Sequence, residues 1–119
     1  MKSTSQSGPH TDATLSQVMD GLWTRFLPDI RERVTVLEAA VQAVGGGALT
    51  REQCEAAQTA AHKLAGVLGT FGLTQGTELA RELELKFTRE SLPGRDAGAP
   101  LAAIAAELRS MVESRKPSH

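Results

Sequence analysis

Among the three histidines of this 119-residue chain, His62 is the one whose neighbours could support chemistry. His10 and His119 lie in polar segments near the two ends, where a solvated, inert imidazole is expected. His62 directly follows Ala61, which belongs to an apolar stripe at helical spacing. One residue is about 100° of helical turn, so His62 is predicted at the edge of a core and partly exposed. A neutral imidazole there can act as a nucleophile, a proton carrier or a metal ligand.

The residues that share a helical face with His62 are polar before it and small after it. They lie three, four or seven positions away and are Glu55, Gln58, Thr59, Ala65, Gly66 and Gly69. A glycine inside a helix costs up to about 1 kcal/mol relative to alanine, so two of them suggest a compensating use. Because helical side chains lean toward the N-terminus, a side chain at position 66 would cover the imidazole, and Gly66 leaves it bare.

An uncovered imidazole beside small residues predicts a surface on which another protein docks. This docking surface would consist of Gln58, Thr59, Ala65, Gly66 and Gly69. The alternative use of the glycines is close packing of helices inside the bundle. That alternative fits Gly69, which stands near the buried stripe, better than Gly66. We interpret Glu55 as a solvated charge.

The elements that must hold His62 are helices, because no segment alternates with a period of two. A first apolar stripe consists of Leu15, Val18, Leu22 and Phe26, and Pro28 is expected to interrupt it. The later stripes are Ile30, Val34, Leu37, Val41 and Val44; Cys54, Ala57, Ala61, Leu64, Leu68 and Phe71; Ala80, Leu83 and Phe87; and Leu101, Ile104, Leu108 and Met111 or Val112.

Local signals mark where these helices begin and end. Thr50 with Gln53 has the pattern of a capping box at the start of the His62 helix, and Gly72 suits the position after it. The fold class predicted is all-α: an antiparallel up-down-up-down four-helix bundle with a short additional N-terminal helix. The bundle would span residues 13–115, with flexible tails at 1–12 and 116–119.

The composition excludes several classes of protein. Thirteen Lys+Arg against 14 Asp+Glu leave a net charge of -1, which does not suit nucleic-acid binding. No stretch approaches the ~18 apolar residues of a transmembrane helix, so no membrane association is expected. The single cysteine, Cys54, rules out an intrachain disulfide and fits the cytoplasm. No second histidine or pair of inward carboxylates accompanies His62, so we expect no metal and no cofactor.

The segment around His62 resembles the signature of histidine phosphotransfer (HPt) domains. An apolar residue follows the histidine at the second position, and glycines follow at the fourth and tenth, in the run Ala61-His62-Lys63-Leu64-Ala65-Gly66-Val67-Leu68-Gly69-Thr70-Phe71-Gly72-Leu73. The end of this run, residues 69–72, is also similar to the phosphoacceptor domain of chemotaxis kinases. Leu79-x-x-x-Leu83-Glu84 resembles the second characteristic helix of the family. The resemblance spans about residues 20–115 and is strongest over 61–84.

This resemblance implies a role for individual residues. His62 matches the phosphorylated histidine, and Glu84 matches the position that hydrogen-bonds its ring. A carboxylate on Nδ1–H would fix the tautomer and leave Nε2 to take the phosphoryl group. The family usually has a lysine three positions after the histidine, where this chain has Ala65. Lys63 and Arg81 are therefore the candidates for the residue that neighbours the phosphate.

The function implied is that of a phosphorelay carrier, which is a substrate rather than an enzyme. A sensor histidine kinase or a phosphorylated receiver would donate the phosphoryl group, and an aspartate of a response-regulator receiver would accept it. The receiver brings the Mg²⁺ in this family, and the chain has no P-loop or kinase-type glycine loop of its own. We expect a monomer, and the sequence leaves open whether the domain stands alone in the cell or is part of a larger sensor. The alternative is a non-phosphorylated helical adaptor or a kinase-inhibiting module, with a hydrolase or metalloenzyme as a third and weaker hypothesis.

Overall fold

The protein folds into a bundle of four helices. The computed structural model describes residues 2–88 and 90–115, with side chains from residue 14 onward. The helices are α1 (Lys2–Gly45), α2 (Arg51–Thr70), α3 (Thr74–Lys86) and α4 (Gly98–Ser114), with a short 3₁₀ helix, η1 (Arg95–Ala97), before α4. The described ranges contain no strand. The all-α fold class predicted from the sequence is confirmed.

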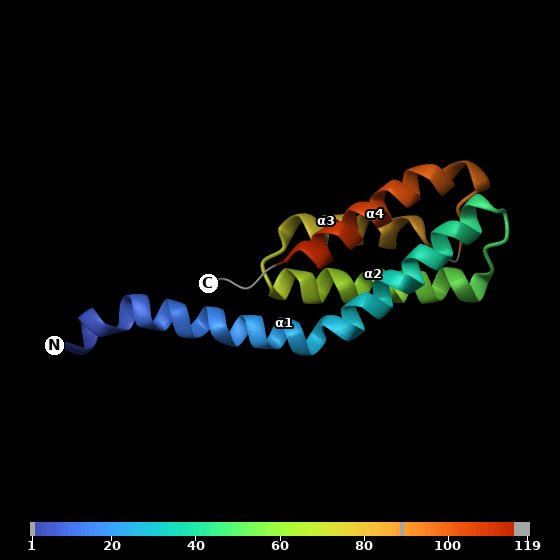
Figure 1. The fold of residues 1–119 in the computed structure, drawn as a ribbon. Coiled ribbons are helices and arrows are strands. Elements are labelled where there is room, and N and C mark those ends of the chain that lie inside the picture. The colour runs from blue at the N-terminus through green and yellow to red at the C-terminus, as the bar shows by residue number, and fades with distance from the viewer. Residues whose placement is uncertain (1, 89, 116–119) are drawn as a thin grey trace.

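Successive helices run in opposite directions, as Figure 1 shows. Helix α1 packs against α2 and α4, and α3 packs against the same two helices from the other side. The α1–α4 contact is therefore the edge of the bundle opposite the α2–α3 contact. Gly47 and Gly72 have φ angles of 69° and 72°, a left-handed conformation that favours glycine, and they form the turns on either side of α2.

Helix α1 corrects one prediction about the N-terminal part of the chain. A short separate helix was expected before Pro28, but α1 continues through Pro28 as one helix of 44 residues. Proline bends a helix that packing holds on both sides, and here Trp23 and Ile30 are both buried. Figure 1 shows α1 bent between its blue and cyan parts. The helix begins at Lys2, within the segment 1–12 that the sequence predicts as a flexible tail, and this flexibility stays a prediction; Met1 and 116–119 lie outside the described residues.

The predicted stripes supply most of the core, and the main exception is the first stripe at the N-terminal end. All five stripe residues from Ile30 to Val44 are buried, and so are those of α2 from Cys54 to Leu68. The first stripe does not follow this rule, because Leu15, Val18 and Phe26 are 59%, 52% and 41% exposed. The N-terminal part of α1 extends beyond the other helices (Figure 1), whereas Phe26 still meets the Phe71 ring at the end of α2, with centroids 6.4 Å apart. None of the described helices is long and apolar enough to cross a membrane.

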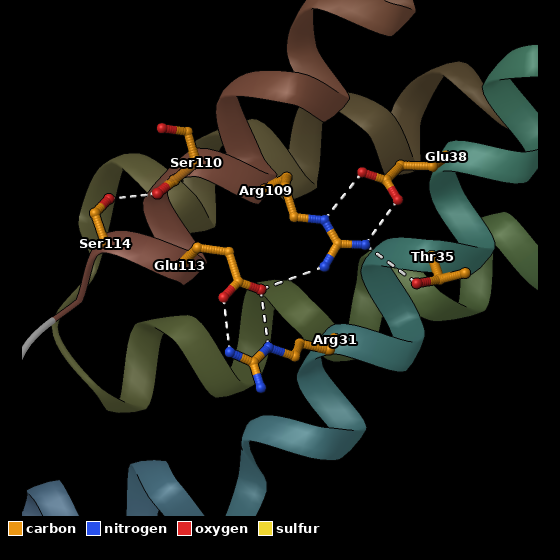
Figure 2. A network of polar contacts seen from close by, with 7 residues as sticks. All are labelled: Arg31, Thr35, Glu38, Arg109, Ser110, Glu113 and Ser114. Atoms are coloured by element: carbon orange, nitrogen blue, oxygen red, sulfur yellow. Dashed lines mark hydrogen bonds and ion pairs between the residues drawn. The ribbon is translucent and has the colours of Figure 1, made fainter.

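A polar network ties α4 to α1 at the edge opposite α2 and α3 (Figure 2). The Arg109 guanidinium donates to both carboxylate oxygens of Glu38, at 3.0 and 2.7 Å, and also to Thr35 Oγ1 at 3.1 Å. Arg31 donates two bonds, of 2.9 and 2.7 Å, to Glu113. These bonds hold the pKa of Glu113 below its ordinary value, chiefly through the hydrogen bond from Arg31. The paired charges fix α4 against α1 through directional bonds that apolar contact cannot provide.

Aromatic side chains close the end of the bundle where α1 leaves it. The Trp23 and Phe71 rings meet edge to face, with centroids 5.1 Å apart. The Arg115 guanidinium lies 5.1 Å from the Trp23 ring centroid and pairs with Asp20 at 3.2 Å. A cation over an aromatic face is attracted by the negative electrostatic potential of the ring face. Arg115, which directly follows α4, is thereby held against α1 and against Phe71 in the α2–α3 turn.

The close approach of Gly45 and Gly98 generates a prediction about stability. A Cβ atom at position 98 would lie 2.7 Å from the Gly45 Cα, which is backbone and cannot move aside cheaply. Gly98→Ala should therefore lower the free energy of unfolding by about 1–3 kcal/mol, measured by urea titration. The control is Gly21→Ala in α1, where a Cβ would meet nothing within 4 Å. An equal stability of the two variants would contradict this packing.

Candidate functional site

His62 lies on the outer side of α2, where its imidazole meets a carboxylate from α3. The His62 side chain is 74% exposed, and its Nδ1 is 2.9 Å from Oε2 of Glu84. The residue that precedes each of them is fully buried: Ala61 before His62, and Leu83 before Glu84. Burial of these two residues fixes the positions of the side chains that follow them. The packing of two apolar residues therefore brings the imidazole and the carboxylate together.

The contact with Glu84 determines which imidazole nitrogen is free. An ionised carboxylate only accepts hydrogen bonds, so a neutral His62 must carry its proton on Nδ1 to make the contact. The lone pair then sits on Nε2, on a side chain that is largely exposed. A ring held in this tautomer presents one nucleophilic nitrogen to a partner.

A shallow recess surrounds the imidazole. Its volume is about 260 Å³, and its lining residues are Gln58, Thr59, His62, Lys63 and Glu84. Lys63 thus lines the same recess as His62, whereas Arg81 is exposed on α3 and is not among the lining residues. Of the two cations considered from the sequence, Lys63 is the one that the structure brings next to the imidazole.

The small residues after His62 divide into exposed and buried ones. Gly66 and Gly69 are exposed, and a Cβ on Gly66 would meet nothing within 4 Å. Ala65 is only 4% exposed, so its assignment to the docking surface was wrong. The reason is that position 65 faces α3, whose Thr77 hydroxyl donates to the Ala65 carbonyl at 3.2 Å.

A second hollow, between α1 and α2, was not predicted from the sequence. This α1–α2 groove has a volume of about 430 Å³ and is lined by Arg33, Val36, Glu52, Glu55, Ala56, Thr59, Ala60 and Lys63. Thr59 and Lys63 also line the recess at His62, so the two hollows adjoin. The groove forms from residues far apart in the chain, and only the packing of α1 on α2 reveals it.

The remaining reactive groups do not form a site. Within residues 2–88 and 90–115, no three His, Cys, Asp or Glu side chains lie where they could share a metal ion. The Cys54 thiol is buried and donates to the Thr88 carbonyl at 3.3 Å. Burial raises the pKa of this thiol, which keeps it protonated and unreactive.

Comparison with known proteins identifies the family. The sequence model of the protein family described as the Hpt domain matches residues 21–116, so the chain belongs to the HPt domain family. Members of this family carry phosphoryl groups in two-component phosphorelays. The chain is similar to Protein RcaC of Microchaete diplosiphon, with 44% identity over 62 residues. That alignment covers 52% of this chain and 10% of RcaC. No solved structure matches the chain significantly.

The open surroundings of Gly66 predict the effect of an alanine there. Gly66→Ala should raise the free energy of unfolding by about 0.5–1 kcal/mol, because alanine is the better helix former and its Cβ would meet no neighbour. Urea titration of the two proteins measures this difference. A loss of stability would mean that Gly66 is required for packing within the bundle.

Proposed function

We propose that this protein is a phosphorelay carrier that accepts a phosphoryl group on Nε2 of His62 and passes it to an aspartate of a response-regulator receiver domain. The observation that supports this proposal most directly is the 2.9 Å contact between His62 Nδ1 and Glu84 Oε2, which leaves Nε2 exposed. Membership of the HPt family supports the class of reaction, and the geometry supports the choice of residue.

The transfer uses the His62–Glu84 pair at each step. The Nε2 lone pair attacks the phosphorus of a phosphorylated aspartate, and the bond from phosphorus to the carboxylate oxygen breaks, with both electrons leaving on that oxygen. The ring keeps its proton on Nδ1 and becomes positively charged. Glu84 stabilises this charge, since its carboxylate already accepts the Nδ1–H bond. In the onward step an aspartate attacks phosphorus, and the electrons of the P–N bond return to Nε2.

Lys63 is the proposed neighbour of the phosphate. It follows His62 directly and lines the same recess, and its ammonium group is on a long, flexible side chain. A phosphoryl group on Nε2 adds negative oxygens that such a cation can meet. Ala65, which occupies the position usual for the family's lysine, is buried against α3 and cannot do so.

The proposed partners are a sensor histidine kinase and a receiver domain, which bind over α2. Gly66 and Gly69 leave the outer side of α2 low, so the backbone of a partner can approach His62. Gln58 and Thr59 flank the imidazole and offer hydrogen bonds. The adjoining α1–α2 groove, with Val36, Ala56 and Ala60 in its lining, offers an apolar recess next to these polar groups.

The chain is proposed to act as a monomer in the cytoplasm. A single chain suffices for the chemistry, because His62 and Glu84 come from the same bundle. The chain covers only 10% of its relative RcaC, so the role of the whole protein in a pathway is part of the proposal.

The first test of the proposal is the loss of phosphorylation in His62→Gln. Wild type incubated with a phosphorylated receiver, or with a histidine kinase and ATP, should acquire a label that is stable in alkali and lost in acid, as a phosphoramidate is. His62→Gln should acquire none, because glutamine lacks a nucleophilic nitrogen of this kind. His10→Gln is the control and should label like wild type. Equal labelling of His62→Gln, or no labelling of wild type, would contradict the proposal and favour a non-phosphorylated adaptor.

The second test asks whether Gly66 serves the partner. Gly66→Trp should slow transfer from a phosphorylated receiver by at least about tenfold, the effect of a clash of ~1.4 kcal/mol at the interface. Helicity measured by circular dichroism should not change, since position 66 is open to solvent. An equally bulky Ala106→Trp on the exposed side of α4 is the control and should not slow transfer. An unaffected rate in Gly66→Trp would show that no partner approaches this side of α2.

A further inference from the structure

We infer that Thr77 positions Glu84 on His62, an inference that rests on the proposed function and adds a residue to its machinery. The Thr77 hydroxyl, on α3, donates to the main-chain carbonyl of Ala65, on α2, at 3.2 Å. This bond is partly buried, whereas the His62–Glu84 bond is exposed to solvent. The Thr77–Ala65 bond between α2 and α3 is therefore better shielded from water than the His62–Glu84 bond.

The Thr77–Ala65 and Glu84–His62 bonds lie close together along the contact between α3 and α2. Thr77 and Glu84 are seven residues apart, which is about two turns of helix and brings both side chains to one face of α3. Ala65 and His62 are three residues apart, so they are neighbours across one turn of α2. The Thr77–Ala65 bond thus sets how far α3 is shifted along α2, and this shift determines where the Glu84 carboxylate meets the imidazole.

The rest of the α2–α3 contact constrains this shift through the fit of apolar side chains and not through directional bonds. It consists largely of small or aliphatic buried side chains such as Ala61, Ala80 and Leu83. The hydrophobic effect has no preferred direction, so this contact resists a small displacement less steeply than a directional bond does. A hydrogen bond weakens steeply once its donor and acceptor separate or lose alignment, and it resists the same displacement.

Gly69 lies next to Thr77. A Cβ atom at position 69 would lie 3.5 Å from Thr77 Oγ1, which is an ordinary van der Waals contact. Gly69 therefore borders Thr77 as well as the exposed side of α2, while a Cβ at Gly66 would meet no neighbour within 4 Å.

The test compares Thr77→Val, which keeps the shape but loses the donor, with Thr77→Ser, which keeps the donor. The first measurement is the ¹⁵N NMR spectrum of the His62 ring, which reports the fraction of molecules protonated on Nδ1. The second is the rate of His62 phosphorylation by phosphoramidate, a small donor that needs no partner protein. Thr77→Val should lower the Nδ1–H fraction and slow phosphorylation by about two- to tenfold, the effect of one hydrogen bond. Thr77→Ser should restore both.

A double-variant experiment separates positioning from general stability. In a Glu84→Ala background there is no carboxylate left to position, so Thr77→Val should cause no further loss of rate. An equal loss in both backgrounds, or an unchanged tautomer and rate in Thr77→Val alone, would overturn the inference. The proposed function fails in a different way, through an unlabelled wild-type protein. In that case the ¹⁵N spectrum of Thr77→Val still decides whether Thr77 positions Glu84.

Discussion

The packing of α2 against α3 is the constraint on which the site depends. The His62 side chain is largely exposed to solvent and the Glu84 side chain is partly exposed. An exposed contact of this kind adds little stability of its own. It exists because Ala61 and Leu83, the residues just before them, are fully buried in the same core. The helices are thus locked by apolar contact and by the Thr77–Ala65 hydrogen bond, and the functional pair follows from that arrangement.

The bundle separates the groups that hold it together from the groups proposed to react. The network of Arg31, Glu38, Arg109 and Glu113 joins α1 to α4 at the edge opposite α2 and α3 (Figure 2). Its charges are satisfied by one another. The outer side of α2, in contrast, has an uncovered imidazole, two exposed glycines and an adjoining groove. The proposed docking of a partner there would therefore leave the contacts that fix α4 intact.

Local chemistry made much of the site predictable from the sequence. The capping box of Thr50 and Gln53 is present, since each side chain bonds the backbone N–H of the other residue, and Gly72 has the left-handed conformation expected after α2. The contact of Glu84 with His62 follows the family pattern and is found in the structure. Each of these features depends on neighbours within a few residues or on a motif that the residues themselves display.

Features that depend on packing between distant segments were missed or misjudged. Pro28 was expected to end a helix, but the burial of Trp23 and Ile30 on either side keeps α1 continuous. Ala65 was placed on the docking surface, because spacing along α2 alone does not tell which side α3 covers. The α1–α2 groove and the Arg109 network join residues that are more than 15 positions apart, and no sequence pattern pairs them.

The central claim is that Nε2 of His62 is the atom that receives the phosphoryl group, with Nδ1–H bonded to Glu84. It is tested most directly by ³¹P and ¹⁵N NMR of the phosphorylated protein with ¹⁵N-labelled histidine. The account predicts a single phosphohistidine at His62, with phosphorus coupled to Nε2 and a proton on Nδ1. Phosphorus on Nδ1 of His62, or on any other residue, would contradict it.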